Sequence, residues 1–453
     1  ELVVYHLGKS NNNETTSVKK IADIWRDGTT EQGSRPIDWL AAITHDQPDV
    51  IYYPEIGMST ATAFMASHRL ANLQITSWGH PITSGLKTID LFLSGELIES
   101  NNADSHYREK LIRLPGTGCC TEIFDTQPQP SVKLETFLAN LPRPIFVIPQ
   151  NYFKFAPEND EIFVQIAERL GTCTFLFPDP NHRKWAFQQL LQRIGSVFIA
   201  QGLDPDCYLK TFPWFNSNRF STLLDHCQVF LDCPGFSGYT TAWQALHRGL
   251  PIVTLEGEFM RQRLAAGLLR QIGITDTIAH DQKNYIDIAV SLAQESLNTE
   301  QFTKRRHSLK SAITKADNRI EVIRAFEKTV ISELSSRNAL PEGFVKKTQQ
   351  APPLTKTIEP NSMPSQTNYP WQKLDADLHL HSLSHDYAPI NLLRMINKPP
   401  KNVLDVGCFC GGSGRWIKDQ FPEAHVTGIE MLEKAAEIAK QYYDEVHTGK
   451  LED

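Results

Sequence analysis

Short apolar runs alternate with amphipathic stretches between about residue 140 and residue 275. The apolar runs are rich in β-branched and aromatic residues and read PIFVIP, CTFLFP, CYLKTF, QVFLDC and PIVTLEG. The stretches between them have helical character, as in ENDEIFVQIAERLG, which carries acids in its first turn and ends at Gly171. Strands buried on both faces that alternate with helices predict a parallel sheet covered by helices.

The first part of the chain shows a similar but less regular alternation. Strand candidates are VIYYPEIG, LQITSWG, IDLFLSG and EKLIRLPG, and helix candidates are SVKKIADIWRDG and TATAFMASHRLA. A proline-rich joint, DTQPQPSVKLETFLANLPRP, follows, and charged helical sequence over 297–335 closes this part. The pattern predicts an α/β fold with two Rossmann-like lobes, an N-terminal lobe over 1–127 whose first strand is missing and a C-terminal lobe over 128–335.

A third unit is predicted after a linker. Residues 336–375 are polar and proline-rich without an apolar period, which is typical of a linker. Within 376–453, KNVLDVGCFCGGSGRWIKDQFPEAHVTGIEM reads as a strand, a glycine-rich turn, a helix and a second strand. The chain starts on a strand rather than at Met and stops inside this unit, so we expect a fragment of a longer protein with a truncated Rossmann-like unit at its end.

Composition and charge narrow the class of protein. Charged residues make up 21% and hydrophobic residues 41% of the 453 residues, which is ordinary for a soluble globular protein. A net charge of −7 gives no support to bulk nucleic-acid binding. No apolar run approaches the roughly 18 residues of a membrane span, and no signal peptide is visible. The eight cysteines include no C-x-x-C pair, and we expect a cytoplasmic protein with reduced thiols.

The turn Gly238-Tyr239-Thr240-Thr241 follows the strand in QVFLDC and opens a helix. The first turn of a helix offers unpaired N–H groups and a partial positive charge, and the two threonines add hydroxyl donors. Gly238 would let a ligand approach the backbone, so the turn suits a phosphate or pyrophosphate. Ordinary N-capping by Ser237 or Thr240 explains the same residues equally well, and the motif alone leaves both interpretations open.

Two further stretches follow strands and carry candidate chemistry. PQNYFKFAP brings Asn151 and Lys154 to the same edge of the sheet, where a lysine can neutralise the charge of a departing diphosphate. A solvated loop lysine is the alternative. In the N-terminal lobe, SWGHPITSG places His80 after a strand, where it could contact a sugar or phosphate or transfer a proton. An exposed loop histidine is the alternative there.

These stretches resemble a known family. SWGHPITSG, HYREKLIRLPG, NYFKFAP and LDCPGFSGYTTAWQALHRGLPIVTLEG, in this order, are similar to the catalytic region of the O-GlcNAc transferase/SPINDLY glycosyltransferases over roughly 1–335. The resemblance implies a GT-B fold, a pair of Rossmann-like lobes. It also implies inverting, metal-independent transfer of a sugar from a UDP- or GDP-sugar donor to a protein or glycan acceptor, with no cofactor besides the donor.

The resemblance implies roles for individual residues. Lys154 corresponds to the family's essential lysine at the donor diphosphate, and Asn151 to a polar position near the nucleotide. Thr240 and Thr241 correspond to the pair that binds the pyrophosphate at the helix start, beside Gly238 and Tyr239. The acceptor is expected to attack from the side of the N-terminal lobe, near His80 and Glu55.

Two positions depart from the family pattern. Phe220 stands where the eukaryotic enzymes carry a histidine against the base, and a phenyl ring could stack there too. Gln244 stands where the family has the aspartate that contacts the ribose, so the nucleotide stays open between UDP and GDP. The expected fragment contains no TPR helices before the lobes, and the family's histidine-bearing first loop would lie before Glu1. A non-catalytic nucleotide-binding scaffold is therefore the alternative to an enzyme.

The last unit resembles the start of a class I S-adenosylmethionine-dependent methyltransferase. In VLDVGCFCGGSG, the resemblance places Asp405, Gly407 and Gly411 in the methionine-binding turn, and Glu430 would hold the ribose hydroxyls of S-adenosylmethionine. A nicotinamide site is the competing interpretation, and the start Asp405-x-Gly407 favours the methyl donor. About half of the strands of such a domain are present.

No metal site is predicted. The histidines of DLHLHSLSHD, residues 377–386, lack further ligands around them in the sequence. The Asp-x-Asp motif at 204–206 precedes a strand, at the wrong edge of the sheet for the donor, and that at 375–377 lies at the end of the linker.

Overall fold

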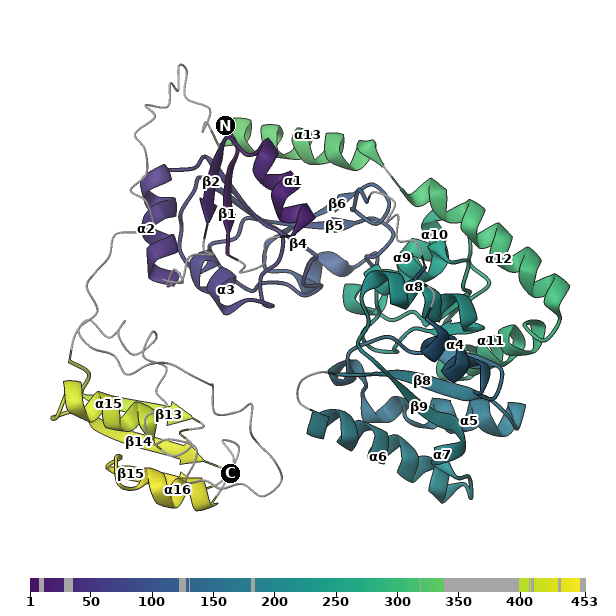
Figure 1. Cartoon of the computed structure of the whole chain (residues 1–453). Coiled ribbons are helices and arrows are strands. Elements are labelled where there is room, and N and C mark those ends of the chain that lie inside the picture. Colours follow the sequence, from purple (N-terminus) through teal and green to yellow (C-terminus); the bar gives the residue numbers. More distant parts are fainter. Residues whose placement is uncertain are drawn as a thin grey trace. The chain divides into compact units, whose positions relative to one another are not determined.

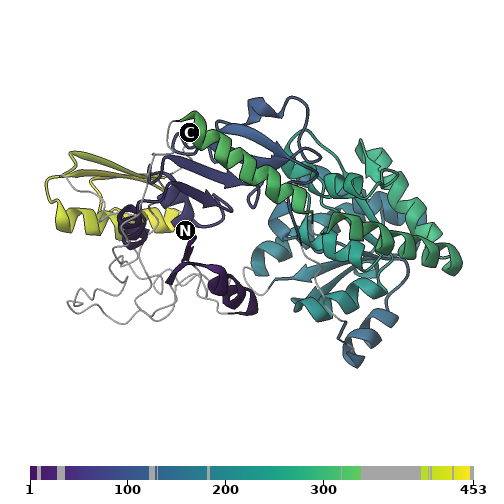
Figure 2. The same cartoon turned by 90° about the horizontal axis from the view of Figure 1, so that it is seen from above.

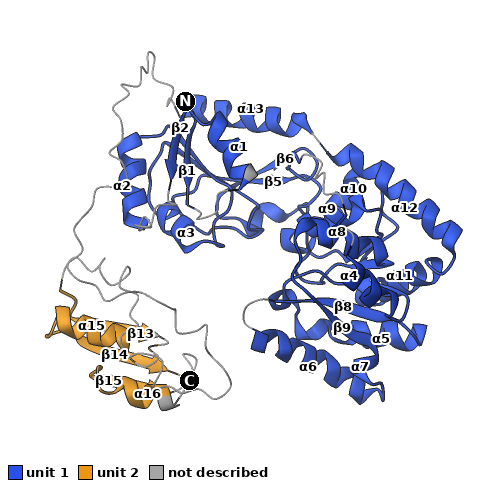
Figure 3. Ribbon diagram, in the orientation of Figure 1, with its two compact units in different colours: residues 1–354 blue, residues 355–453 orange. Residues whose placement is uncertain are grey.

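The structure is a computed structural model of the chain (Figure 1, and from above in Figure 2). It describes residues 1–7, 12–27, 36–121, 128–129, 131–180, 184–317, 319–337, 399–406, 408, 411–430 and 433–448. The chain divides into two compact units, residues 1–354 and 355–453 (Figure 3). Apart from residues 336 and 337, the expected linker lies outside the described residues, as does the histidine-rich stretch 377–386.

A six-stranded parallel sheet forms the centre of the C-terminal lobe. The strands, in their order across the sheet, are β12 (Ile278–Ala279), β11 (Ile252–Leu255), β10 (Val229–Leu231), β7 (Ile145–Val147), β8 (Thr174–Asp179) and β9 (Leu209–Pro213). Numbered along the chain from β7, the order reads 3-2-1-4-5-6, the doubly wound order of dinucleotide-binding folds. Each apolar run of the sequence gives one of the strands β7 to β11, which confirms the predicted α/β fold.

Helices cover both faces of this sheet because its strands are apolar on both sides. One core contains Trp243 and Leu268, and the other contains Phe163 and Tyr285. Helix α5 ends at Gly171, whose φ of 72° fits the predicted stop. The helices are α4 (Val132–Ala139), α5 (Glu161–Leu170), α6 (Lys184–Ala200), α7 (Pro205–Tyr208), α8 (Ser217–His226), α9 (Thr240–His247), α10 (Leu264–Gln271) and α11 (Gln282–Glu295), with 3-10 turns η2 (Tyr152–Lys154), η3 (Pro157–Asn159) and η4 (Met260–Gln262).

The N-terminal lobe contains a four-stranded parallel sheet and a separate pair of strands. The sheet has the order β3 (Val50–Tyr53), β4 (Leu73–Ser77), β5 (Leu91–Gly95) and β6 (Lys110–Leu114), and β1 (Val3–His6) pairs only with β2 (Ile24–Asp27) among the described strands. The other elements are α1 (Asn13–Ile21), α2 (Pro36–Asp46), α3 (Thr60–Ala66) and η1 (Ala103–His106).

One local prediction for this lobe was wrong. SVKKIADIWRDG was expected to be a helix throughout, but α1 ends at Ile21 and Ala22 has an extended backbone. The following IWRD pairs in parallel with VVYH of β1. A β-branched and aromatic pair of residues favours a strand once such a partner is present, and the partner is distant in the sequence.

The last two helices of the first unit connect its lobes (Figure 1). Helix α12 (Thr299–Ile313) packs against the C-terminal lobe through Leu309 and Ile313, and the turn η5 (Thr314–Ala316) follows it. Helix α13 (Ile320–Ser336) instead packs Val322 and Leu334 against strands of the N-terminal lobe. By its packing, α13 thus belongs to the N-terminal lobe rather than to the lobe in which the sequence boundary at 335 placed it.

The second unit has three parallel strands in the order β13 (Asn402–Val406), β14 (His425–Glu430) and β15 (Glu445–Thr448). Helices α15 (Gly412–Gln420) and α16 (Glu433–Ala439) alternate with them. This order is that of one half of a doubly wound sheet. Among the described residues of the chain, no helix combines the length and apolar character needed to cross a membrane.

Candidate functional site

The candidate site lies at the point where the C-terminal sheet changes direction. Strands β7 and β10 are neighbours in the sheet, although β8 and β9 lie between them in the chain. The helical connections after such a pair of strands run to opposite faces, which opens a crevice at their carboxyl ends. The segment that carries Asn151 and Lys154 follows β7, and the turn that begins at Gly238 follows β10. The strand order therefore brings the two candidate motifs together.

A cleft of about 1060 Å³ lies between the lobes at this point. It is lined by Glu14, Gly57, Met58, Trp78, Gly79, His80, Pro81, Cys119, Thr121, Asn151, Phe153, Lys154, Phe236, Ser237, Tyr239, Thr240, Trp243 and Leu264. Among the predicted site residues, His80, Asn151, Lys154, Tyr239 and Thr240 line it. Residues from both lobes thus meet in one cavity large enough for a nucleotide-sized ligand.

Lys154 is held against the turn that follows β10. Its Nζ donates to the carbonyl oxygen of Ser237 at 3.3 Å and lies 4.3 Å from the ring centre of Phe236. Burial lowers the pKa of Lys154 below its ordinary value of 10.5, and the charges of Asp232 and Cys233 act in the opposite direction. The amine is therefore partly desolvated, which strengthens its interaction with an anion in the cleft.

The start of α9 has N–H groups that no side chain caps. Tyr239 is the N-cap residue and makes no side-chain cap hydrogen bond. The predicted alternative, capping by Ser237, is not what the structure has, because the Ser237 hydroxyl donates to Asp232 at 2.6 Å. The first turn of α9 therefore keeps donors for an anionic ligand, as the phosphate interpretation requires.

Position 238 requires glycine because a side chain there would crowd neighbouring protein atoms, and not because a ligand approaches its backbone. Its N–H donates to Asp232 Oδ1 at 2.8 Å. A Cβ atom at this position would lie 3.0 Å from the hydroxyl of Thr241 and 3.5 Å from Gln150. Neither Gly238 nor Thr241 lines the cleft, whereas Tyr239 and Thr240 do.

The N-terminal lobe contacts the same turn directly. The Tyr239 hydroxyl lies 2.9 Å from that of Thr117, and the Tyr239 ring meets Trp78 edge-on with 4.7 Å between ring centres. His80 is half-buried on the wall formed by this lobe and packs over Gly57, where a Cβ atom would lie 2.7 Å from its ring. The positive φ of Gly57, 122°, and the close ring both require glycine there.

Besides Gly238 and Thr241, three further predicted site residues, Glu55, Phe220 and Gln244, do not line the cleft. Both carboxylate oxygens of Glu55 accept hydrogen bonds, from the Met58 N–H at 2.7 Å and the Thr62 hydroxyl at 2.9 Å, so Glu55 braces the entry to α3. Phe220 on α8 packs against the apolar core of its own lobe. Gln244 lies on α9, about one helical turn after Thr240, and is likewise absent from the lining.

Sequence reasoning missed Asp232, the residue that organises the turn. Its side chain is almost fully buried and accepts hydrogen bonds from Gly238, Ser237, Thr254 and Gln150. The sequence feature that could have identified Asp232 is the position of an acid directly after the wholly apolar strand VFL. A charged residue in such a place needs partners, because an unpaired buried charge is costly.

In the second unit, the two predicted acids lie near the carboxyl ends of neighbouring strands. Asp405 in β13 accepts a hydrogen bond from the Tyr443 hydroxyl at 2.6 Å, and Glu430 ends β14 and is buried. Gly411 precedes α15 with a φ of 94°, and a Cβ atom there would lie 2.8 Å from the Tyr442 ring. Gly407 lies outside the described residues.

The first unit is similar to known glycosyltransferases in sequence and in fold. Residues 218–320 match glycosyl transferase family 41. This family 41 segment contains α8, β10, the Gly238 turn, α9 and β11, and so covers one side of the cleft.

Two curated relatives match a little over half of this chain. A tomato (Solanum lycopersicum) protein, "Probable UDP-N-acetylglucosamine--peptide N-acetylglucosaminyltransferase SPINDLY", is 24% identical over 258 residues, which are 55% of this chain and 26% of that protein. An Arabidopsis thaliana SEC protein of the same described activity is 29% identical over 241 residues, 52% of this chain and 24% of its own length. The chain thus spans about a quarter of the length of these relatives.

Among solved structures, a mutant O-GlcNAc transferase from Thermobaculum terrenum has a TM-score of 0.61 at 21% identity. The match covers 75% of this chain and 62% of that chain. The fold of the first unit is therefore of the GT-B type found in glycosyltransferases.

Proposed function

We propose that the first unit is a nucleotide-sugar-dependent glycosyltransferase that transfers its sugar to a protein acceptor with inversion and without a metal ion. The observation that carries the proposal is the meeting of Lys154 with the uncapped start of α9 in one cleft between the lobes. The family 41 match and the described activity of the SPINDLY and SEC relatives support a UDP-sugar donor and a peptide acceptor. A GDP-sugar donor is the alternative to be tested, because Gln244 stands where the family has the aspartate that contacts the ribose.

In this reaction, an acceptor oxygen attacks the anomeric carbon from the face opposite the diphosphate. The bond between that carbon and the diphosphate oxygen breaks, and its electron pair leaves with the nucleoside diphosphate. In the proposed reaction, Lys154 and the N–H groups at Tyr239 and Thr240 stabilise the negative charge that develops there. Donors of this kind, fixed in advance in a partly dry cleft, are among the strongest contributions to catalysis.

His80 lines the opposite wall of the cleft and is proposed to contact the sugar or the acceptor. A histidine can act as the general base that takes the proton lost by the attacking hydroxyl. Glu55 is not given this role, since both of its oxygens are engaged in the N-terminal lobe. Substitution His80→Gln should reduce transfer much more than nucleotide affinity.

Lys154→Ala tests the proposal directly. Removing one donor from a developing anion costs about 10²-fold or more in turnover, whereas affinity for the nucleoside diphosphate should fall less. Lys133→Ala, which removes an exposed lysine on α4, is the matched control and should leave both quantities unchanged. Titration calorimetry with UDP and GDP measures binding, and transfer of labelled sugar to peptides measures turnover.

The outcomes separate the enzyme from the alternative. Near wild-type turnover in Lys154→Ala would remove this residue from the mechanism. Binding of neither UDP nor GDP by the wild-type chain would contradict the glycosyltransferase. Binding of a nucleotide without sugar transfer would favour the non-catalytic nucleotide-binding scaffold.

For the second unit, we propose a partial S-adenosylmethionine site in which Glu430 accepts hydrogen bonds from the ribose hydroxyls. The support is the alternation of three parallel strands with helices and an acid at the end of the second strand. Titration with S-adenosylmethionine and with NAD tests this assignment. Glu430→Gln should weaken binding of the methyl donor, and tighter binding of NAD would contradict the assignment.

A further inference from the structure

Asp232 is a buried carboxylate directly behind the cleft. It follows β10, and 1% of its surface is exposed. Its Oδ1 accepts from the Gly238 N–H at 2.8 Å and from the Gln150 side-chain amide at 3.1 Å, and its Oδ2 accepts from the hydroxyls of Ser237 at 2.6 Å and Thr254 at 2.7 Å. Each oxygen thus has two donors, which is the full complement of an ionised carboxylate.

The same carboxylate is linked to Lys154 through Ser237. The Ser237 hydroxyl donates to Asp232, while the Ser237 carbonyl accepts from Lys154 Nζ. Ser237 also accepts a hydrogen bond from the Ala265 N–H of α10 at 2.9 Å. A second hydrogen bond joins the same two segments, since the Cys233 thiol donates to the Lys154 carbonyl oxygen at 3.2 Å. The lysine segment and the turn before α9 are therefore fixed to each other around Asp232.

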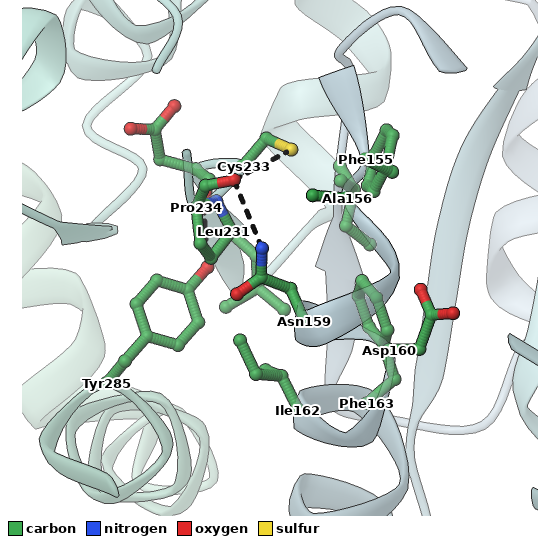
Figure 4. A pocket seen from close by; sticks show the side chains of 12 residues that line it. Phe155, Ala156, Asn159, Asp160, Ile162, Phe163, Leu231, Cys233, Pro234 and Tyr285 are labelled. Atoms are coloured by element: carbon green, nitrogen blue, oxygen red, sulfur yellow. Dashed lines mark hydrogen bonds between the residues drawn. The ribbon is translucent and has the colours of Figure 1, made fainter. Parts of the chain in front are cut away.

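Figure 4 shows that the strand end is also held from behind. The Tyr285 hydroxyl from α11 donates to the Asp232 carbonyl oxygen at 2.8 Å, and the Asn159 side chain lies 3.5 Å from the Pro234 carbonyl oxygen. Tyr285 is almost fully buried, so this support is rigid. The position of the carboxylate is consequently set by the protein before any ligand arrives.

We propose that Asp232 is a positioning residue for the donor diphosphate. It orients the Ser237–Gly238 backbone so that the exposed N–H groups of α9 face the cleft, and its negative charge keeps Lys154 cationic in a partly desolvated place. The inference rests on the proposed function of the cleft. A position that only filled the core would not require an ion, because burying a charge costs several kcal/mol before its partners compensate.

The charges around the two groups give a measurable consequence. Burial raises the pKa of Asp232, whereas the hydrogen bonds from Ser237, Gly238 and Thr254 and the charge of Lys154 act against that rise. Burial lowers the pKa of Lys154, and Asp232 is the first of the charges that oppose this. Loss of the negative charge would therefore lower the pKa of Lys154 further, so that the amine would lose its proton at a lower pH.

The test compares Asp232→Asn with Thr254→Val in the whole chain. The first removes the charge at nearly constant volume, and the second removes one hydrogen bond and leaves the charge. The titration of Lys154 is followed by its acylation rate against pH, read by mass spectrometry, which does not depend on glycosyl transfer. We expect the midpoint for Lys154 to fall by about one pH unit in Asp232→Asn, since an opposite charge nearby shifts a pKa by one to three units, and to stay unchanged in Thr254→Val.

An unchanged Lys154 midpoint in folded Asp232→Asn would overturn the proposal. If that variant does not fold, Ser237→Ala decides, because it removes one of the two hydrogen bonds between Asp232 and the turn but keeps the charge. Its affinity for UDP or GDP should fall about tenfold, in line with the roughly 1–3 kcal/mol of a lost buried hydrogen bond, with unchanged affinity for the uncharged nucleosides. Equal effects on nucleoside and nucleoside diphosphate would contradict positioning. If the wild type binds neither, the proposed function fails, and the Lys154 titration still decides the role of Asp232.

Discussion

Gly267 provides a sharp test of how closely the two lobes pack. It lies in α10 of the C-terminal lobe, where a Cβ atom would be 2.3 Å from Ile98 Cγ2 and 2.9 Å from the Leu97 carbonyl oxygen of the N-terminal lobe. Carbon atoms in contact are about 3.5–4.0 Å apart, so a methyl group there requires a shift of about 1.2 Å or more. Ile98 is fully buried against Phe92 and Leu264 and has little room to move.

Gly267→Ala should therefore destabilise the first unit despite the helix propensity of alanine. Overpacking of this kind costs about 1–3 kcal/mol, and replacing glycine by alanine in a helix contributes about 1 kcal/mol in the opposite direction. Gly195→Ala in α6 is the matched control, because its Cβ atom would meet only Pro205 at an ordinary 3.5 Å. This control should be more stable than the wild type by about 0.5–1 kcal/mol.

The assay is urea unfolding followed by fluorescence, with the free energy of unfolding compared between the two variants. The difference between them isolates the contact between the lobes, because the helix propensity term is common to both. We expect Gly267→Ala to be less stable than Gly195→Ala by about 1–3 kcal/mol. Equal stabilisation by both substitutions would show that the lobes do not approach each other at Gly267 as described.

Three further outcomes are expected. Tyr285→Phe should lower the free energy of unfolding by about 1–3 kcal/mol, because it leaves the buried Asp232 carbonyl oxygen without this donor; an unchanged urea midpoint would contradict this. Burial would raise the pKa of Asp90, but Arg69, the Gln74 N–H and Arg337 outweigh it and hold the pKa below 3.8. Asp90→Asn should thus be less stable than the wild type above that pH, and the difference should vanish as pH falls through the lowered pKa; a difference that persists at low pH in acid unfolding curves would refute the assignment. Sugar transfer should continue in excess EDTA, because Lys154 and the α9 amides are proposed to meet the leaving-group charge; loss of activity that Mn²⁺ or Mg²⁺ restores would overturn that mechanism.

Much of the fold could be predicted from the sequence because local patterns specify it. Runs such as QVFLDC and PIVTLEG are short and apolar without alternation, which is typical of a strand covered on both faces. Gly171 ended its helix as predicted, since its positive φ disfavours other residues. The prediction failed at IWRD, where the local pattern allowed a helix and a distant partner strand decided otherwise.

For the candidate site, the sequence by itself determined the chemical groups: a lysine after one strand, a Gly-x-Thr-Thr turn after another, and a histidine in the other lobe. Only the tertiary structure decided which of them meet. The strand order places β7 beside β10, and this brings Lys154 to Ser237 although 83 residues separate them. The structure also shows that Glu55 faces α3 through Met58 and Thr62. Asp232 was missed because two of its partners, Gln150 and Thr254, lie 82 and 22 residues away in the chain, which no local pattern encodes.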